Sequence, residues 1–318
     1  MLLIFQFFLS IFLLYLGAEI IINTSIVISN KLKIPRLIIG LTVVSFATSL
    51  PELFVSLQAA LINASDFAIG NIIGSNISNI TFVLGITSII SPIILKKDEF
   101  KLQYISVLLT TLLFCFCFFN LKYLGLSYGI ISILLLVIFN IFLFINGKNI
   151  ISQDFIEDNN LKILSLNINI QNFLLLSLLL LSGSVILWLA SDLLIDSSRA
   201  IANLLSVSDR IISLSIVAIG TSFPELIASV YSAFKKETKL AIGNLLGSNI
   251  FNILSVIGFT SLISDLHINS MMNYDVLIML LTTILLAPIY YFGKGQISQN
   301  LGVFIFFIYI IYLLLILI

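Results

Sequence analysis

Long apolar segments separated by short polar connections make up nearly the whole chain. A helix needs about 20 residues to cross a bilayer, and ten segments approach or exceed this length. The longest connection, at about 147–171, contains acidic residues and asparagines and separates five apolar segments from five. The pattern predicts an all-α membrane protein with ten transmembrane helices, at roughly 2–28, 34–63, 67–93, 102–120, 124–146, 172–198, 208–234, 240–264, 274–292 and 300–318.

The two halves, 1–146 and 172–318, share sequence at a constant spacing. Thr48 corresponds to Thr221, a spacing of 173 residues, and no gap is needed from about residue 14 to residue 93. Each half has five spans, an odd number, so the halves enter the membrane in opposite senses. Many secondary transporters have such inverted-topology repeats, with the substrate near the midplane between them. The sequence therefore predicts two five-helix repeats joined by the linker 147–171.

One hexapeptide occurs in both halves, at 47–52 (ATSLPE) and 220–225 (GTSFPE). Its proline cannot donate a backbone hydrogen bond and crowds the carbonyl four residues earlier, so each segment is predicted to be a broken helix. In lipid, such a free carbonyl is tolerated only against protein or a water-filled cavity. The threonine, serine and glutamate add side-chain oxygens within one turn, and hard cations such as calcium and sodium prefer all-oxygen ligands.

The glutamates of the hexapeptides, Glu52 and Glu225, are the strongest candidates for a functional site. A carboxylate at the middle of a bilayer is costly and usually functional. No lysine, arginine or histidine lies in the same spans at comparable depth. Two nearby carboxylates would also repel one another. A bound divalent cation, or bound sodium ions and protons, would relieve both problems.

A second motif, Gly-Asn-x-x-Gly-Ser-Asn-Ile-x-Asn, follows each hexapeptide. Its glycines have the spacing that lets membrane helices approach closely, so we interpret them as residues of helix–helix packing. Ser75 and Asn79 share one helical face, as do Ser248 and Asn252. If these faces look at the hexapeptides, four segments surround one polar cavity. The alternative for the asparagines is hydrogen bonding between helices.

Composition and charge agree with a polytopic membrane protein. Hydrophobic residues make up 60% of the chain and charged residues 9%, against about 25% charged in soluble domains. With the N-terminus outside, twelve of the 15 lysines and arginines fall in inner loops. Because cytoplasmic loops are enriched in these residues, we expect a plasma (inner) membrane protein with both termini outside and a cytoplasmic linker.

Other chemistries find little support in the sequence. Cys115 and Cys117 lie in an apolar span, and two cysteines alone cannot build a zinc site. The only histidine, His267, lies in a polar loop, and no nucleophile–base pair accompanies the hexapeptides. We therefore expect no enzyme activity, no cofactor, no nucleic acid and no obligatory protein partner. The expected partners are the lipid bilayer and transported calcium and sodium ions.

The paired segments VSFATSLPELFVS with GNIIGSNISNI, and VAIGTSFPELIAS with GNLLGSNIFNI, resemble the alpha repeats of the sodium/calcium exchanger family. This family lies within the cation/calcium antiporter superfamily. The resemblance covers both halves, with the alpha-1 motif at about 40–85 and the alpha-2 motif at about 213–258. It implies a small prokaryotic-type antiporter with ten helices that exports calcium by alternating access, driven by sodium entry. The first spans of the two halves would slide as a pair against the other eight.

The resemblance also implies roles for individual residues. Glu52 and Glu225 would be the calcium carboxylates, shared with sodium. Thr48 and Thr221 would contribute oxygens, including backbone carbonyls, to the central site. Ser49, Ser75 and the Ser45 carbonyl would form a sodium site toward one face. Ser222, Ser248 and the Ala218 carbonyl would form its counterpart. Asn79 and Asn252 would line the middle.

This chain departs from the family pattern in two ways. Ala47 replaces a common glycine, which alters packing and not ligands. Asn79 and Asn252 are both asparagine where some members, including potassium-dependent ones, have an aspartate; this argues against potassium dependence. The proton-driven branch typically has a Gly-Asn-Ala-Thr-Glu-like segment, so the serine–proline form here favours sodium. A calcium or other divalent cation/proton antiporter and a passive cation channel remain the alternatives.

Overall fold

The computed structural model describes residues 2–150, 161–163, 166–168, 172–204, 220 and 222–317, which are mostly helical. Six strands of two or three residues are a small addition to the predicted all-α class. The first half contains α1 (Leu2–Leu32), α2 (Arg36–Ile39), η1 (Gly40–Val44), α3 (Ser45–Thr48), α4 (Leu50–Leu61), α5 (Ser65–Ser78), η2 (Asn79–Val83), α6 (Leu84–Ile90), β1 (Ile93–Ile94), α7 (Lys97–Asn120), β2 (Tyr123–Leu124) and α8 (Leu126–Ile150).

The other described elements lie between residues 161 and 317. The described elements there are β3 (Leu161–Ile163), β4 (Leu166–Ile168), α9 (Phe173–Leu204), α12 (Phe223–Phe234), α13 (Thr238–Phe251), η4 (Asn252–Ile257), α14 (Gly258–Ile263), β5 (Leu266–His267), η5 (Ser270–Met272), α15 (Asn273–Phe292), β6 (Gln296–Ile297) and α16 (Gln299–Leu317). The predicted linker begins inside α8 and includes the β3–β4 hairpin. The first part of the predicted seventh span, 208–219, lies outside the described residues.

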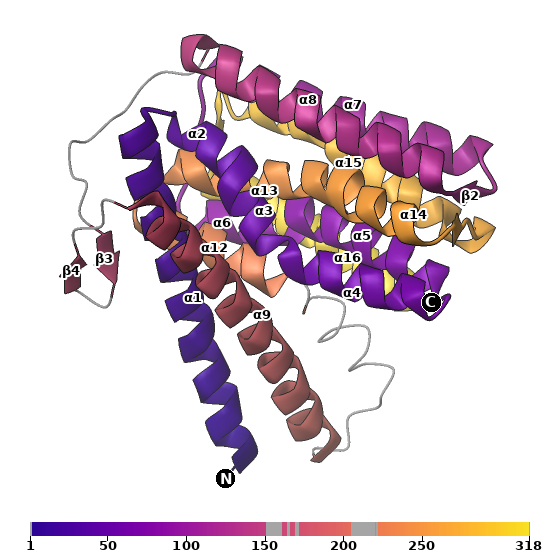
Figure 1. Ribbon diagram of the computed structural model, residues 1–318, viewed down its shortest axis with the longest axis horizontal. Helices are drawn as coiled ribbons and strands as arrows, with labels where there is room; N and C mark the ends of the chain where they lie inside the picture. Colours follow the sequence, from indigo (N-terminus) through magenta and orange to yellow (C-terminus); the bar gives the residue numbers. More distant parts are fainter. Residues whose placement is uncertain are drawn as a thin grey trace.

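Two long helices, α1 and α9, lie side by side and lean away from the other helices, which form a compact bundle (Figure 1). Their crossing depends on two glycines. A Cβ atom on Gly17 would lie 3.1 Å from the Gly183 carbonyl oxygen, and one on Gly183 would lie 2.7 Å from the Ile21 side chain. Small residues at such crossings let membrane helices pack backbone to backbone.

The predicted break in the second span is present. Residues 36–48 and 50–61 form two helices at 44° to one another, with the bend at Ser49. Pro51, which lies in the first turn of α4, accounts for the break because it ends the preceding hydrogen-bond ladder. The third and eighth spans contain π-helical turns that begin at the equivalent residues Asn79 and Asn252. Such turns widen a helix and occur frequently at functional sites.

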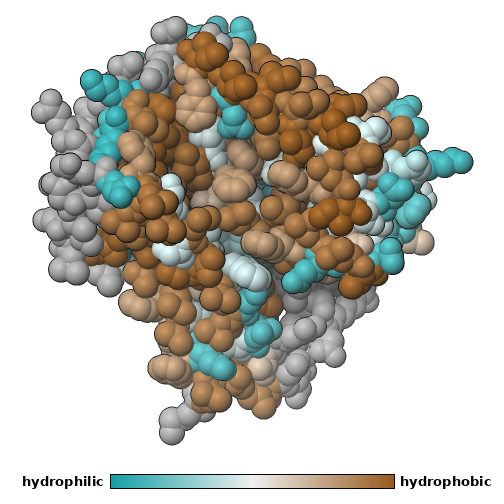
Figure 2. Space-filling model, in the orientation of Figure 1, coloured by the Kyte–Doolittle hydropathy of each residue, from teal (hydrophilic) through white to brown (hydrophobic). Residues whose placement is uncertain are grey.

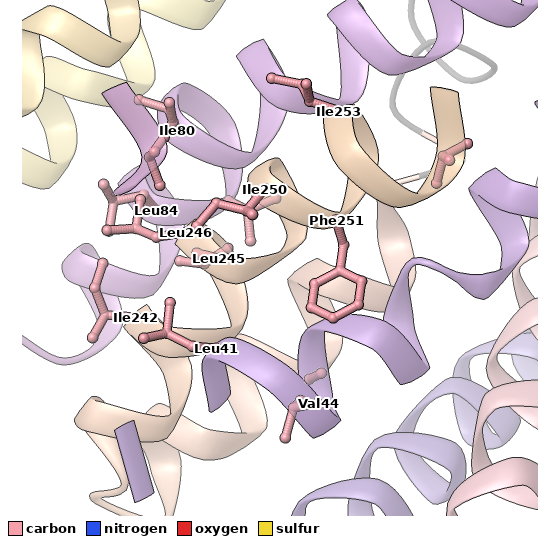
Figure 3. Close-up of a cluster of buried hydrophobic side chains, with 14 of the residues drawn as sticks. Leu41, Val44, Ile80, Leu84, Ile242, Leu245, Leu246, Ile250, Phe251 and Ile253 are labelled. Carbon is pink, nitrogen blue, oxygen red and sulfur yellow. The ribbon is translucent and has the colours of Figure 1, made fainter. Parts of the chain in front are cut away.

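Helix α13 forms the centre of the bundle. The most apolar part of its span is entirely buried, and η1 packs directly against it. A Cβ on Gly40 would lie 2.6 Å from the Leu240 carbonyl oxygen. In Figure 3, Leu41 of η1 lies beside Ile242 of α13, while Leu84 of α6 lies near Leu246. This apolar layer holds the polar segments at fixed positions.

Contacts between the halves occur in equivalent pairs at the 173-residue spacing. Strand β1 pairs with β6 and β2 pairs with β5. The pair Ile93–Ile297 becomes Leu266–Leu124 when each residue is replaced by its counterpart, and both pairs are observed. The equivalence therefore extends beyond residue 93, where the similarity detectable in the sequence ends.

Contacts between loops test the predicted number of spans. Lys239 Nζ lies 3.1 Å from Glu99 Oε1, and Arg36 forms an ion pair with Glu237. The Asn269 amide donates to Asp66 Oδ2 at 2.8 Å. Each contact joins loops that the ten-span prediction places on the same side of the membrane, and the β1–β6 and β2–β5 pairs do so as well.

The outer surface is suited to lipid. Hydrophobic side chains cover most of the face seen in Figure 2, and hydrophilic ones lie mainly toward its edges. Seven of the described helices are long and apolar enough to cross a membrane, and the bent pair in residues 36–61 adds an eighth. Helix α16 is a shorter apolar helix. The protein is an integral membrane protein.

The close approach of η1 and α13 predicts different costs for one substitution at two equivalent glycines. A Cβ on Gly243 would lie 2.6 Å from the Leu37 carbonyl oxygen, whereas one on Gly70 would meet only the Met272 side chain, at 3.7 Å. We expect Gly243→Ala to cost about 1–3 kcal/mol through overpacking and Gly70→Ala to be neutral. Thermal unfolding in detergent measures both; an equal melting temperature for the two variants would contradict the prediction.

Candidate functional site

The two hexapeptides place their carboxylates at helix starts inside the protein. Ser49 and Ser222 are the residues just before α4 and α12, and each helix has its proline and glutamate in the first turn. Proline is tolerated there because the first amide groups have no partner within the helix. The positive end of the helix dipole favours an acidic side chain at this position. The sequence thus builds two inward-facing acidic helix starts.

Glu52 and Glu225 are fully buried and close enough to interact electrostatically. Ser49 Oγ donates to Glu225 Oε1 at 3.3 Å, so the first hexapeptide touches the carboxylate of the second. The hydroxyls of Thr48 and Ser248 also face the Glu225 carboxyl group. No ion pair to either glutamate is found among the residues that the structure describes. The structure therefore brings the two hexapeptides together and buries both carboxylates.

Several buried oxygens of the predicted site have no hydrogen-bond partner within the described part of the chain. Leaving a buried polar group unpaired costs about 1–3 kcal/mol, and more for a charged one. These six atoms come from the two hexapeptides and from the two π-helical turns: Glu52 Oε1 and Oε2, Glu225 Oε2, Ser222 Oγ, Asn79 Oδ1 and Asn252 Oδ1.

Four asparagines link the two halves through matched hydrogen bonds. Asn79 Nδ2 donates to Asn249 Oδ1 at 3.1 Å, and Asn252 Nδ2 donates to Asn76 Oδ1 at 3.0 Å. The Asn249 amide also donates to the Asn76 carbonyl at 3.2 Å, and the reverse bond is 3.4 Å. These bonds use the NH₂ groups of Asn79 and Asn252 and leave their oxygens free. Hydrogen bonding between helices and a lining role are therefore compatible.

Asn244 belongs to the second motif, but the sequence pattern did not predict it to be a site residue. Thr48 Oγ1 donates to Asn244 Oδ1 at 3.0 Å and lies 3.4 Å from Ser248 Oγ. The Asn244 amide in turn donates to Ser229 Oγ at 3.1 Å, and Asn71 makes the equivalent bond to Ser56 at 3.2 Å. Asn244 therefore orients Thr48. The occurrence of asparagine at both equivalent positions, 71 and 244, is the sequence feature that could have predicted a role for Asn244.

The other predicted residues fall into two groups. Ser45 and Ser75 are buried; the Ser45 carbonyl accepts the Ser49 amide at 3.0 Å, and its hydroxyl donates to the Leu41 carbonyl at 2.8 Å. Thr221 and the Ala218 carbonyl lie outside the described residues.

Pro224 cannot donate a hydrogen bond to the Gly220 carbonyl, and a side chain of another helix donates to it instead. Ser191 Oγ, on α9, donates to the Gly220 carbonyl oxygen at 2.7 Å. The equivalent of Ser191 in the first half is Ala18, which has no hydroxyl. Sequence reasoning missed this bond because a single serine in an apolar helix gives no distinctive pattern.

The chemistry available at the site is limited to oxygen ligands. The described residues contain no group of three or more His, Cys, Asp or Glu that could hold a metal ion. A cation here would be bound by two carboxylates together with hydroxyl, amide and carbonyl oxygens, the ligands that calcium and sodium prefer. The fold and the site thus define a polytopic membrane protein in which two carboxyl groups, one from each of two related halves, are buried together.

Comparison with known proteins places this arrangement in a family. The family model described as sodium/calcium exchanger protein matches residues 2–147 and 175–318. The chain belongs to the sodium/calcium exchanger family.

Relatives of similar length match nearly the whole chain. It is 34% identical to uncharacterized membrane protein MJ0091 of Methanocaldococcus jannaschii over 91% of each chain. It is 31% identical to inner membrane protein YrbG of Escherichia coli, covering 90% of this chain and 88% of YrbG. The sodium/calcium exchanger MaX1 of Methanosarcina acetivorans is 27% identical over 93% of each. A solved structure of the sodium-calcium exchanger NCX_Mj, soaked with zero Na⁺ and Ca²⁺, superposes with a TM-score of 0.79 and 28% identity over 99% of both chains.

Loss of the Ser191 hydroxyl provides a test of how the broken helix is satisfied. Ser191→Ala leaves the Gly220 carbonyl without this donor, and hydrogen bonds between membrane helices are worth about 0.6–2 kcal/mol. We expect a lower melting temperature in detergent for Ser191→Ala. The matched control is Ser184→Ala on the same helix, whose hydroxyl bonds only to its own helix, at the Leu180 carbonyl. A shift of the control as large as that of Ser191→Ala would refute the assignment.

Proposed function

We propose that the protein is a secondary antiporter that exchanges calcium for sodium across a membrane by alternating access. One observation supports this most strongly: Glu52 and Glu225 are buried together without a basic partner among the described residues. Burial of two unpaired carboxylates costs several kcal/mol each unless a counter-ion is bound. A transported cation supplies that counter-ion, and membership of the exchanger family supports calcium and sodium as the ions.

The charge of the cavity fits one calcium ion. Two carboxylates carry two negative charges, and Asn79 and Asn252 add oxygens without adding charge. Calcium takes six to eight oxygen ligands, and the free oxygens of the glutamates, Ser222 and the two asparagines provide six. Sodium ions would occupy subsets of the same oxygens, so that the two cations compete for the cavity.

The proposed roles of individual residues are those that the resemblance to the exchanger family implies. Glu52 and Glu225 bind calcium and share sodium, and Thr48 with Thr221 contributes oxygens beside them. One flanking sodium position uses Ser49, Ser75 and the Ser45 carbonyl, and the other uses Ser222, Ser248 and the Ala218 carbonyl. The side-chain amides of Asn79 and Asn252 lie between the two positions. The ions are the transported substrates, and the proposal requires no cofactor and no enzyme activity.

The proposed architecture is ten helices in two inverted five-helix repeats, 1–146 and 172–318, connected by 147–171. The matched β1–β6 and β2–β5 pairs support this plan because each strand pair is the repeat counterpart of the other. The positive-inside rule supports outer N- and C-termini and a cytoplasmic linker in the plasma (inner) membrane. Alternating access by sliding of α1 and α9 is supported by the way these two helices pack on one another and lean away from the other helices (Figure 1).

The second candidate is an antiporter that exchanges calcium, or another divalent cation, for protons. The same two buried carboxylates favour it, because a carboxylate can bind a proton as well as a metal ion. The serine–proline form of the hexapeptide favours sodium. A passive channel is less well supported, because the cavity carboxylates are fully buried and not on an open pore.

The coupling ion is tested by flux into vesicles containing the purified protein. We expect an outward sodium gradient to drive uptake of radioactive calcium, and an outward proton gradient of equal size to drive little. If only the proton gradient drives calcium uptake, the coupling ion is the proton and not sodium. Calcium flux that needs neither gradient would identify a channel.

The two carboxylates are tested by isosteric substitution. We expect Glu52→Gln and Glu225→Gln each to reduce sodium-driven calcium uptake by at least a hundredfold, because half of the cavity charge is lost. The folded state should remain, since glutamine removes an unpaired buried charge. Glu237→Gln, which alters a glutamate paired with Arg36 outside the cavity, is the matched control. Retained uptake in either cavity variant would refute the site.

A further inference from the structure

Helices α7 and α8 run side by side along one edge of the bundle (Figure 1). Two cavities, of about 650 Å³ and about 340 Å³, lie along them. The cavities adjoin, because Ser106, Leu109 and Phe142 line both. We call the continuous depression that they form, from Asp98 to Leu113 along α7, the α7–α8 groove.

The part of the groove farthest from Asp98 is apolar. Its two hydroxyl groups already donate within α7, since Ser106 bonds to the Leu102 carbonyl at 2.8 Å and Thr110 to the Ser106 carbonyl at 2.7 Å. The remaining lining there is aliphatic or aromatic, and Leu254 of η4 contributes a buried side chain. In a bilayer this part of the groove meets hydrocarbon, so an acyl chain is the occupant that its lining fits.

The other end of the groove is charged. Asp98 and Lys101 both line it, and both are exposed. They are three residues apart, so they share one face of α7, with Cβ atoms about 5–6 Å from one another. Within the part of the chain that the structure describes, neither forms an ion pair. Because charged residues occupy the first turns of α7, this end of the groove lies in the headgroup region of the membrane.

The length of the groove fits one leaflet of a bilayer. Lys101 and Leu113 are twelve residues apart, which is about 18 Å along a helix axis. Half of the hydrocarbon core of a bilayer is about 15 Å thick. The groove therefore extends from the headgroup region to about the middle of the membrane, along the path that one acyl chain of a phospholipid follows.

Selection among phospholipids depends on the charged end. Apolar contacts inside a membrane replace equivalent contacts with other lipid chains, so they favour no particular lipid strongly. The Lys101 ammonium group can bind a phosphate, and the Asp98 carboxylate can accept hydrogen bonds from an ammonium group. Lys101 lies about 4.5 Å further into the membrane along α7 than Asp98. In a phospholipid, the phosphate likewise lies further in than the terminal group of the head.

We propose that the α7–α8 groove binds one phospholipid with a phosphoethanolamine headgroup. Lys101 pairs with its phosphate, Asp98 accepts hydrogen bonds from its ammonium group, and one acyl chain lies between α7 and α8. A choline headgroup has no N–H to donate to Asp98, and a glycerol headgroup has no positive charge. The chain also contacts Leu254, two residues after Asn252, so the lipid touches the π-helical turn η4.

Native mass spectrometry of the purified full-length protein tests the choice of headgroup. Three lipids with identical oleoyl chains are titrated separately: phosphatidylethanolamine, phosphatidylcholine and phosphatidylglycerol. A hydrogen bond to a charged group is worth on the order of tenfold in affinity. We therefore expect the first phosphatidylethanolamine molecule to bind about tenfold more tightly than either of the others. Equal or tighter binding of phosphatidylcholine or phosphatidylglycerol would overturn the proposal.

Two variants that each remove one charge separate the two headgroup contacts. Lys101→Gln should weaken phosphatidylethanolamine and phosphatidylcholine alike, by about tenfold, because both lipids have the phosphate. Asp98→Asn should weaken only phosphatidylethanolamine, to the affinity of phosphatidylcholine. The matched control is Lys122→Gln, which removes an exposed lysine beyond the opposite end of α7 and should change neither affinity. An equal loss in Lys122→Gln and Lys101→Gln would contradict the assignment.

A bulky side chain inside the groove tests where the acyl chain lies. Ser106→Phe fills the place where the two cavities adjoin and leaves the charged end intact, so the tight binding of the first phosphatidylethanolamine should be lost. Leu112→Phe enlarges an exposed residue of α7 that lines neither cavity and should retain it. Unchanged binding in Ser106→Phe would refute the location. Lipid binding is measured here without ion flux, so these outcomes are independent of the proposed antiport.

Discussion

Two carboxylates buried together without a basic neighbour are the constraint on which the other features of this protein depend. Glu52 and Glu225 are fully buried, and the described residues place no lysine, arginine or histidine in an ion pair with them. Such a pair is unfavourable in an empty, low-dielectric cavity because the charges repel and are not solvated. It becomes favourable when a cation occupies the cavity, so binding energy is available to a transported ion.

The local structure places several oxygen atoms without hydrogen-bond partners in the hexapeptides and in the π-helical turns at Asn79 and Asn252. The prolines end one helix and begin another, so each glutamate lies at the positive end of a helix dipole. The asparagine pairs hold the amide groups by their NH₂ sides and leave the oxygens of Asn79 and Asn252 free. Close helix contacts at Gly40 and Gly243 fix the segments in position. Tight apolar packing of the helices thus holds the polar side chains of the site in position.

The two halves are similar in sequence but differ in how they are arranged. The core contacts follow the repeat closely, as the two strand pairs show. The contacts of α1 and α9 do not, since Tyr15 and Trp188 meet partners that differ by one turn. The strand pairs of the core are therefore symmetric, whereas the aromatic contacts of α1 and α9 are not.

The sequence alone determined the membrane class, the repeated motifs, the broken second span and the importance of Glu52 and Glu225, because each depends on local composition or on a pattern repeated at fixed spacing. Only the tertiary structure decided that Asn244 orients Thr48, that Ser191 satisfies the Gly220 carbonyl and that Tyr231 binds Glu19. These are contacts between helices distant in the chain. An isolated serine or tyrosine in an apolar span gives no periodic signal, and its partner is set by how the helices pack against one another.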